Sequence, residues 1–579
     1  MKRILLHRNA GSIVRKTFFV LAFCLSLMTQ QVDAASATWN LHPTNGEWNN
    51  PLNWMPATVP NGPADMATFG LSNVTDLFLS ANTEVAGVVF SPGASVYTIT
   101  ASPTFTLTLS GTGITNGSGI TQNFVAAVDS AGHAGAITFT HNATVSTSTT
   151  LTANGSLVPN IDGAAITFLD SSTAGAGTLT VNGGATVAGN GGSARFYDTS
   201  SAGNAAVTIN AGAVNGGNWG EVDFYDRSTA AQATFMNNGP VFGELGNIGG
   251  FLIFHDASSA ANAVIVNNGG TISGAGGSFA SFLDNSTAGA ATIKNIGGAA
   301  AGAIGGQTGF GDSASAGHAT IVSDGGAVSG AYGASMLFSS NSTAGASTLI
   351  ANAGPGLGVL VGGMIEFAEN SEGGTARVEV FGNGFIDIHN HNGPGLTIGS
   401  LEGTGQIFLG SNNLSVGSNN RSTEFSGMMH DGDPFGGGLA GGSLTKIGAG
   451  TLTLGGADTY TGPTVVSAGN LIVNGSITSP VTVNGGSLAG SGTVRAVTVE
   501  STGTLTPGDS RPGILHVAGN LTLTMGSTYL VDLDGAAVGA QYDQTEVTGS
   551  VSLGNATLSL KLGFSAAAGD MFNVINNDG

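Results

Sequence analysis

Six aspartates recur at a fixed place in the chain and are the first candidates for chemistry. Each stands two residues after a phenylalanine of an internal repeat, and the six are Asp170, Asp198, Asp226, Asp256, Asp284 and Asp312. Carboxylate oxygens in a row are the ligands that Ca²⁺ prefers, so the series predicts a calcium ladder. The alternative is a column of turn-forming aspartates whose carboxylates accept hydrogen bonds from nearby backbone amides. Both interpretations stay open here, and no other cofactor is expected.

A second candidate metal site is the run Asp387-x-His389-x-His391. On a strand, a spacing of two would place the carboxylate and both imidazoles on one face. These ligand types suit Zn²⁺. The neighbouring Asn and Gly residues indicate a solvated turn instead, and the sequence shows no fourth ligand. The run is therefore a candidate zinc site whose alternative is an ordinary polar surface.

The elements that must position these side chains are set by a repeat of about 28 residues. Self-similarity at such a period is typical of solenoid proteins. The nine copies are marked by Phe139, Phe168, Phe196, Phe224, Phe254, Phe282, Phe310, Phe338 and Phe367. A second apolar residue follows eleven positions later in every copy but the first, at Leu179, Val207, Phe235, Ile265, Ile293, Ile321, Leu349 and Val378.

Each copy is interpreted as three short strands, for example at 165–169, 177–181 and 185–187. Thr alternating with Ile, Leu or Val is typical of half-buried strands, and Asn and Gly between them are turn residues. One such coil cannot bury its apolar face alone, but coils stacked at about 4.8 Å form a continuous core. The sequence therefore predicts an all-β fold, a β-solenoid of the right-handed parallel β-helix type. The phenylalanines should form an internal stack.

The N-terminal residues 1–37 have the features of a secretory signal peptide. Five basic residues precede the apolar run 17–28, and cleavage fits after Ala34 or Ala37. Cys24 is the one cysteine of the chain and would leave with this segment. No later apolar run is long enough for a membrane-spanning helix. We therefore expect a secreted or cell-surface protein without a transmembrane segment after signal cleavage.

The charge of the chain excludes one class of partner. Only 8% of residues are charged, and 35 acidic residues against 14 basic ones give a net charge of −21. The expected signal peptide holds five of the basic residues and one acidic residue, so the mature chain is more acidic still. Such a surface repels phosphate backbones, and we expect no nucleic-acid binding.

One segment resembles a known family. The run LTKIGAGTLTLGGADTYTGPTVVSAGNLIVNG at 444–475 is similar to the autotransporter-associated β-strand repeat of bacterial surface-protein passengers. Segments 505–515 and 542–560 resemble end caps of such passengers, and the sequence around Trp48 and Trp54 resembles their N-terminal opening. The predicted organisation is a signal peptide, a Trp-containing cap with first coils at 38–135, the nine-copy region at 136–395 and a passenger-repeat solenoid at 396–579.

The resemblance implies a bacterial outer-surface or secreted β-helix with a structural or adhesive role. Its partners would be extracellular matrix, a host surface or glycans. It transfers no catalytic residues. The last residues offer no outer-membrane barrel strands, so the chain is expected to be a passenger truncated at its C-terminus, or one that is released rather than anchored.

The alternative is a polysaccharide-degrading β-helix enzyme, a lyase or a hydrolase. Such chemistry needs clustered carboxylates with a base, or carboxylate-bound Ca²⁺ beside a basic residue. Arg195, Arg227 and Arg377 are interpreted as isolated because they occupy different positions in the repeat. We therefore predict that the protein is not an enzyme and assign no catalytic residue.

Overall fold

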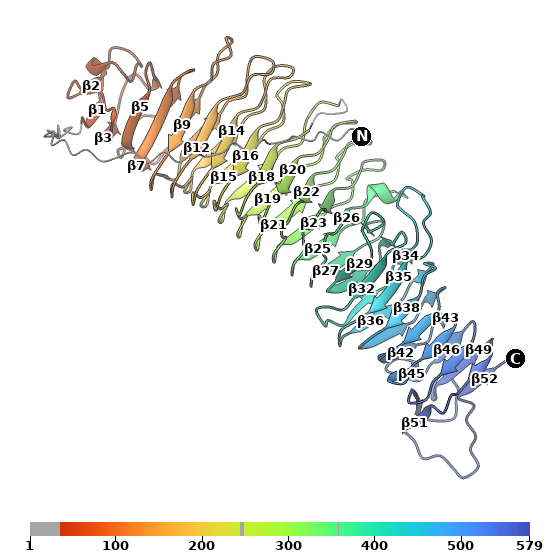
Figure 1. Cartoon of the computed structure of the whole chain (residues 1–579). Helices are drawn as coiled ribbons and strands as arrows, with labels where there is room; N and C mark the ends of the chain where they lie inside the picture. Colours follow the sequence, from red (N-terminus) through yellow and green to blue (C-terminus); the bar gives the residue numbers. More distant parts are fainter. Residues whose placement is uncertain (1–34, 244–247, 357, 579) are drawn as a thin grey trace, which may run out of the picture.

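The protein is a long, curved stack of β-coils (Figure 1). The computed structural model describes residues 35–243, 248–356 and 358–578, so the predicted signal peptide at 1–37 lies almost wholly outside the described residues. Between successive coils the strands pair in parallel, as between β12 (Ala165–Phe168) and β14 (Ser193–Phe196). The helices in the described part are two single 3₁₀ turns, η1 (Pro51–Asn53) and η2 (Val359–Val361). The predicted all-β parallel β-helix is confirmed.

Each coil of the nine-copy region contributes one strand to each of two sheets. The first sheet contains β9 (Ala136–Phe139), β12, β14, β16 (Glu221–Phe224), β18 (Phe251–Phe254), β20 (Phe279–Phe282), β22 (Gln307–Phe310), β24 (Ser335–Phe338) and β26 (Met364–Phe367). The second sheet contains β11 (Thr149–Ala153), β13 (Thr178–Val181), β15 (Ala206–Ile209), β17 (Thr234–Asn237), β19 (Val264–Asn267), β21 (Thr292–Asn295), β23 (Thr320–Ser323), β25 (Thr348–Ala351) and β27 (Arg377–Val380). The register follows the repeat, because Phe168 lies opposite Phe196 and Leu179 lies opposite Val207.

The prediction of a third strand at 185–187 is wrong. That segment is a loop, in which the Gly189 amide donates to the Thr186 carbonyl at 3.0 Å and Ala188 adopts a left-handed φ of 56°. Flanking glycines favour such a turn over a strand. The third contact between coils is instead a one-residue parallel bridge, as between Thr173 and Ser201.

The core of the nine-copy region is a column of phenylalanine rings. From Phe139 to Phe367, successive ring centroids lie 4.5 to 4.8 Å apart with planes within 11° of parallel. All nine rings are buried. The predicted internal stack is therefore confirmed, and its spacing equals the distance between neighbouring strands of a sheet.

Beyond β27 the coils become shorter and three-sided. The first sheet ends with β28 (Phe385–Asp387), β31 (Gln406–Phe408) and β34 (Met428–His430). The second sheet continues through β30 (Ser400–Gly403), β33 (Thr423–Phe425), β36 (Thr451–Leu454), β39 (Asn470–Val473), β42 (Gly486–Gly490), β45 (Gly503–Pro507), β48 (Thr528–Leu533) and β51 (Thr557–Leu562). A third sheet contains β29 (Gly395–Ile398), β32 (Asn413–Val416), β35 (Ser443–Lys446), β38 (Thr464–Val466), β41 (Val481–Val483), β44 (Val497–Val499), β47 (Leu521–Leu523) and β50 (Val551–Ser552). A fourth contains β37 (Ala457–Asp458), β40 (Ser476–Ile477), β43 (Thr493–Val494), β46 (Ile514–Val517), β49 (Gln544–Val547) and β52 (Ile575–Asn577).

The N-terminal end is closed by buried aromatic side chains. Trp39, Trp48 and Trp54 surround Phe69, with ring centroids 5.0 to 6.2 Å apart. The strands here are β1 (Ala37–Trp39), β2 (Trp54–Met55), β3 (Gly62–Phe69), β4 (Asp76–Phe78), β5 (Thr83–Phe90), β6 (Thr98–Ala101), β7 (Thr106–Asn116) and β8 (Gln122–Ala126). The short strand β10 (Thr144–Val145), between β9 and β11 in the first copy, pairs with β7. In the described ranges, no helix is long and apolar enough to cross a membrane.

Candidate functional site

The six predicted aspartates form one column on the surface of the stack, joined by hydrogen bonds between coils. The Asp198 carboxylate accepts a hydrogen bond from the backbone amide of Asp170 at 3.0 Å. The same bond recurs to Asp226, Asp256, Asp284 and Asp312 at 3.0 to 3.2 Å, and it begins at His141, whose amide donates to Asp170. Each carboxylate therefore helps to hold one coil on the next.

The backbone conformation explains why aspartate occupies these positions. All six residues have a positive φ between 49° and 57°, the left-handed region, which Asp and Asn tolerate better than other non-glycine residues. The geometry agrees with the turn-forming alternative. The hydrogen bonds between coils use one oxygen of each carboxylate and need no metal ion. The calcium ladder therefore stays a prediction.

The second predicted metal site is only partly assembled. His389 Nδ1 lies 2.7 Å from Asp387 Oδ1, and the His389 amide donates to the same oxygen. His391 is turned away, because its two ring nitrogens lie 2.7 Å from the Ser371 carbonyl and 2.6 Å from the Asn392 carbonyl. The expected strand face does not exist, since β28 ends at Asp387 and a turn follows.

The zinc interpretation thus lacks a closed ligand set. Among the residues that the structure describes, no three His, Cys, Asp or Glu side chains gather into a group that could hold a metal. Burial raises the pKa of Asp387. The pKa of Glu366, which lies opposite Asp387 in the sheet, is raised first by burial and then by the negative charge of Asp387. The site stays a prediction that a metal titration must test.

Sequence analysis missed a charged cluster on the outer face of the first sheet. Arg195 Nε lies 3.8 Å from Asp223 Oδ2, and His255 Nε2 lies 3.6 Å from the other oxygen of Asp223. Glu221 stands on the same face, and burial together with the Asp223 charge raises its pKa. The repeat held the signal, because Arg195 and Asp223 both directly precede a repeat phenylalanine.

The view that the arginines are isolated is therefore wrong for two of them. Arg195 faces Asp223, and Arg377 pairs with both Glu379 and Glu402 at 3.0 and 2.7 Å. Asp223 and Glu402 come from the next coil, so separation along the sequence concealed these two contacts, whereas Glu379 stands two residues from Arg377.

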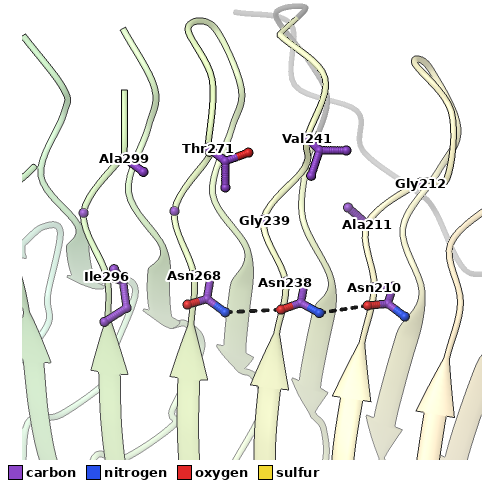
Figure 2. Close-up of a pocket in the computed structure, with 12 residues that line it drawn as sticks. Asn210, Ala211, Gly212, Asn238, Gly239, Val241, Asn268, Thr271, Ile296 and Ala299 are labelled. Carbon is purple, nitrogen blue, oxygen red and sulfur yellow. Dashed lines mark hydrogen bonds between the residues drawn. The ribbon is translucent and has the colours of Figure 1, made fainter. Parts of the chain in front are cut away.

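Several grooves lie along the loops that lead from the second sheet back to the first, and two of them combine polar and apolar side chains. One, the amide groove, has a volume of about 420 Å³ and includes Asn210, Asn238 and Asn268, whose side-chain amides bond one to the next (Figure 2). The other, the aromatic groove, has a volume of about 460 Å³. It is lined by Asp162, Asn190, Arg195, Asn218, Trp219 and Glu221, among others.

The coil from β35 to β39 buries polar side chains that its sequence motif shares with the resembling family. Lys446 is buried, and its ammonium donates to the Ile447, Gly448 and Ala468 carbonyls at 2.6, 3.0 and 3.2 Å. Burial lowers the pKa of Lys446 to about 8.

The same motif supplies two further buried polar groups. Asp458 accepts the Met429 amide at 2.8 Å, and the hydroxyl of Tyr460 lies 2.6 Å from that of Thr464. Lys446 and Asp458 thus join this coil to its neighbours through the Ala468 carbonyl and the Met429 amide, whereas Tyr460 bonds to a residue four positions along the chain.

Comparison with known proteins matches this coil to one family. Residues 444–473 fit the family model of the passenger-associated-transport-repeat. The chain carries an autotransporter passenger repeat. It is a passenger-type β-helix, as the resemblance implied.

One curated protein shares a stretch of similar sequence with this chain. The passenger-type chain is 42% identical over 93 residues to a protein named extracellular serine protease from Serratia marcescens. The match covers 16% of this chain and spans 9% of the length of that relative. Activity and partners of the whole relative therefore do not transfer by similarity alone.

Proposed function

We propose that this chain acts outside the cell as a structural and adhesive β-helix and that it is not an enzyme. Its expected partners are extracellular matrix, a host surface or glycans. Export by the predicted signal peptide would deliver it to the medium or the cell surface. The extracellular relative supports the location, while the adhesive role follows from the passenger resemblance.

The observation that carries the proposal is the regularity of the stack. The same carboxylate-to-amide bond and the same buried ring recur from coil to coil, and the rod then continues into the passenger repeat. Repetition of this kind builds an extended surface, which suits binding of large partners.

A binding and turnover experiment tests the proposal. The purified full chain is applied to immobilised fibronectin, collagen and laminin and to cultured epithelial cells. It is also assayed on casein and on a panel of neutral and acidic polysaccharides for released peptides, reducing ends or unsaturated products. We expect saturable binding to at least one surface and no product.

Two results would contradict the proposal. Absence of binding to every surface would remove the adhesive role. Repeated turnover of a substrate would show the enzyme alternative. Loss of that turnover in Glu221→Gln, with retention in Glu366→Gln, would assign it to Glu221. Glu366 is the matched control because both glutamates lie half-buried on the outer face of the first sheet.

A further inference from the structure

The aromatic groove is lined by polar side chains as well as by an aromatic ring. One wall is a ladder in which Asn218 Nδ2 donates to Asn190 Oδ1 at 2.7 Å and Asn190 Nδ2 donates to Asp162 Oδ1 at 2.8 Å. Arg195 and Glu221 belong to the same groove. Amides, carboxylates and a guanidinium together offer both donors and acceptors, which is what a ligand rich in hydroxyl groups needs.

Trp219 gives this groove an apolar surface. Its ring is half-buried and lies 5.1 Å from that of Phe251, which stacks in turn on Phe279 at 5.1 Å. One repeat period earlier in the chain stands Gly191, which also lines the groove and has no side chain to cover the indole. Binding sites for small molecules commonly combine such an aromatic surface with a few placed polar groups.

The charges select the kind of ligand. Asp162 and Glu221 bring two carboxylates to the groove. Its one guanidinium, that of Arg195, lies 3.8 Å from a third carboxylate, Asp223. The whole chain adds a net charge of −21. An anionic ligand would be repelled, while an uncharged one would meet no penalty of this kind.

We propose that the aromatic groove binds an uncharged oligosaccharide, one sugar ring of which packs against Trp219 while its hydroxyl groups bond to Asn190 and Glu221. The coil spacing of about 4.8 Å brings a new set of groups along the groove at intervals close to the length of one sugar unit. This inference rests on the proposed adhesive function and names its ligand class.

Tryptophan fluorescence offers a direct test. The other three tryptophans of the chain, Trp39, Trp48 and Trp54, are buried at the N-terminal end, so a change on adding ligand reports on Trp219. The full chain is titrated with maltohexaose, cellohexaose and the hexamer of N-acetylglucosamine, and with oligogalacturonate as an acidic probe. We expect a saturable change with at least one uncharged probe and none with oligogalacturonate.

Variants assign the site. Calorimetry should show at least tenfold weaker binding by Trp219→Ala and weaker binding by Asn190→Ala, which changes the polar wall without touching the indole. Val241→Ala is the matched control, because Val241 is 58% exposed and lines the amide groove instead. Melting curves verify that each variant is folded.

The outcomes separate this inference from the proposed function. A chain that adheres to matrix or cells but binds none of the uncharged probes at millimolar concentration would overturn the groove assignment alone. Preference for oligogalacturonate, or equal affinity in the wild type and both groove variants, would also overturn it.

Discussion

The carboxylate of Asp226 accepts a hydrogen bond from the backbone amide of Asp198, a residue 28 positions earlier in the chain. The contact joins two left-handed residues in successive coils, so one side chain satisfies an amide that the turn leaves without a ladder partner. Repetition of this bond makes the surface column part of the architecture.

Replacing a single carboxylate should test that role. We expect Asp226→Ala to lower the free energy of unfolding by about 1 to 2 kcal/mol, because an acceptor is lost and alanine disfavours a φ of 55°. Asp226→Asn keeps an oxygen acceptor and tolerates the left-handed turn, so it should unfold close to the wild type in urea.

The same column decides the calcium prediction. With the amides as partners, we expect the wild-type melting temperature to be the same in excess EDTA and in millimolar CaCl₂. If CaCl₂ raised the melting temperature of the wild type, and raised that of Asp226→Asn by less, the aspartates would instead be assigned to calcium binding.

The ring stack predicts a large effect of one core substitution. Phe254 is fully buried between Phe224 and Phe282, with centroids 4.8 and 4.7 Å away. Phe254→Ala should lower the free energy of unfolding by about 3 to 5 kcal/mol, because the rigid column cannot close over the cavity. Val264→Ala, 42% exposed in the same coil, is the control and should change it little. Equal urea midpoints for the two variants would contradict the stack as a major source of stability.

Asp458 predicts a dependence of stability on pH. Burial raises its pKa to about 7, against about 3.9 for an unfolded chain. Between these values the folded protein binds more protons than the unfolded chain, so the stability contributed by Asp458 falls as pH rises from about 4 to 7 and stays low above that. Asp458→Asn should remove this pH dependence. At pH 8 its free energy of unfolding should exceed that of the wild type by a few kcal/mol, because each unit of pKa difference is worth about 1.4 kcal/mol.

Urea denaturation at pH 5, 6, 7 and 8 measures this effect. Burial also raises the pKa of Asp543, to about 6, so the wild-type slope has more than one source and the variants must be compared with one another. The exposed Asp509→Asn is the control and should keep the wild-type slope. An Asp458→Asn curve parallel to that control would show that the carboxyl is not stabilised in its protonated form.

The N-terminal contacts choose between the two predicted cleavage sites. The Ala35 amide donates to Asp65 at 2.6 Å, and Ala37 pairs with Ala67 in β1. Cleavage after Ala37 would remove these contacts, so we expect export to yield a chain that begins at Ala35. Mass spectrometry of the exported protein should find this N-terminus, and a chain beginning at Thr38 would contradict the prediction.

The sequence by itself determined the repeating part of the fold. In a parallel stack each residue lies against the residue one period away, so the spacing from Phe168 to Phe196 already specified which rings meet. The same logic placed Asp170 and Asp198 in one column and indicated their turn. Likewise, the motif at 444–473 was enough to match the passenger-associated-transport-repeat.

Only the tertiary structure decided the features that break this periodicity. The glycines around 185–187 allowed a loop where alternation indicated a strand, since local pattern cannot show where the chain leaves the sheet. Lys446 and Asp458 look like surface residues in the sequence, and only the packing of neighbouring coils buries them. The aromatic groove likewise exists because loops of successive coils place Trp219 beside Asn190 and Glu221. Contacts of this kind depend on the path of each loop, which a repeat period does not encode.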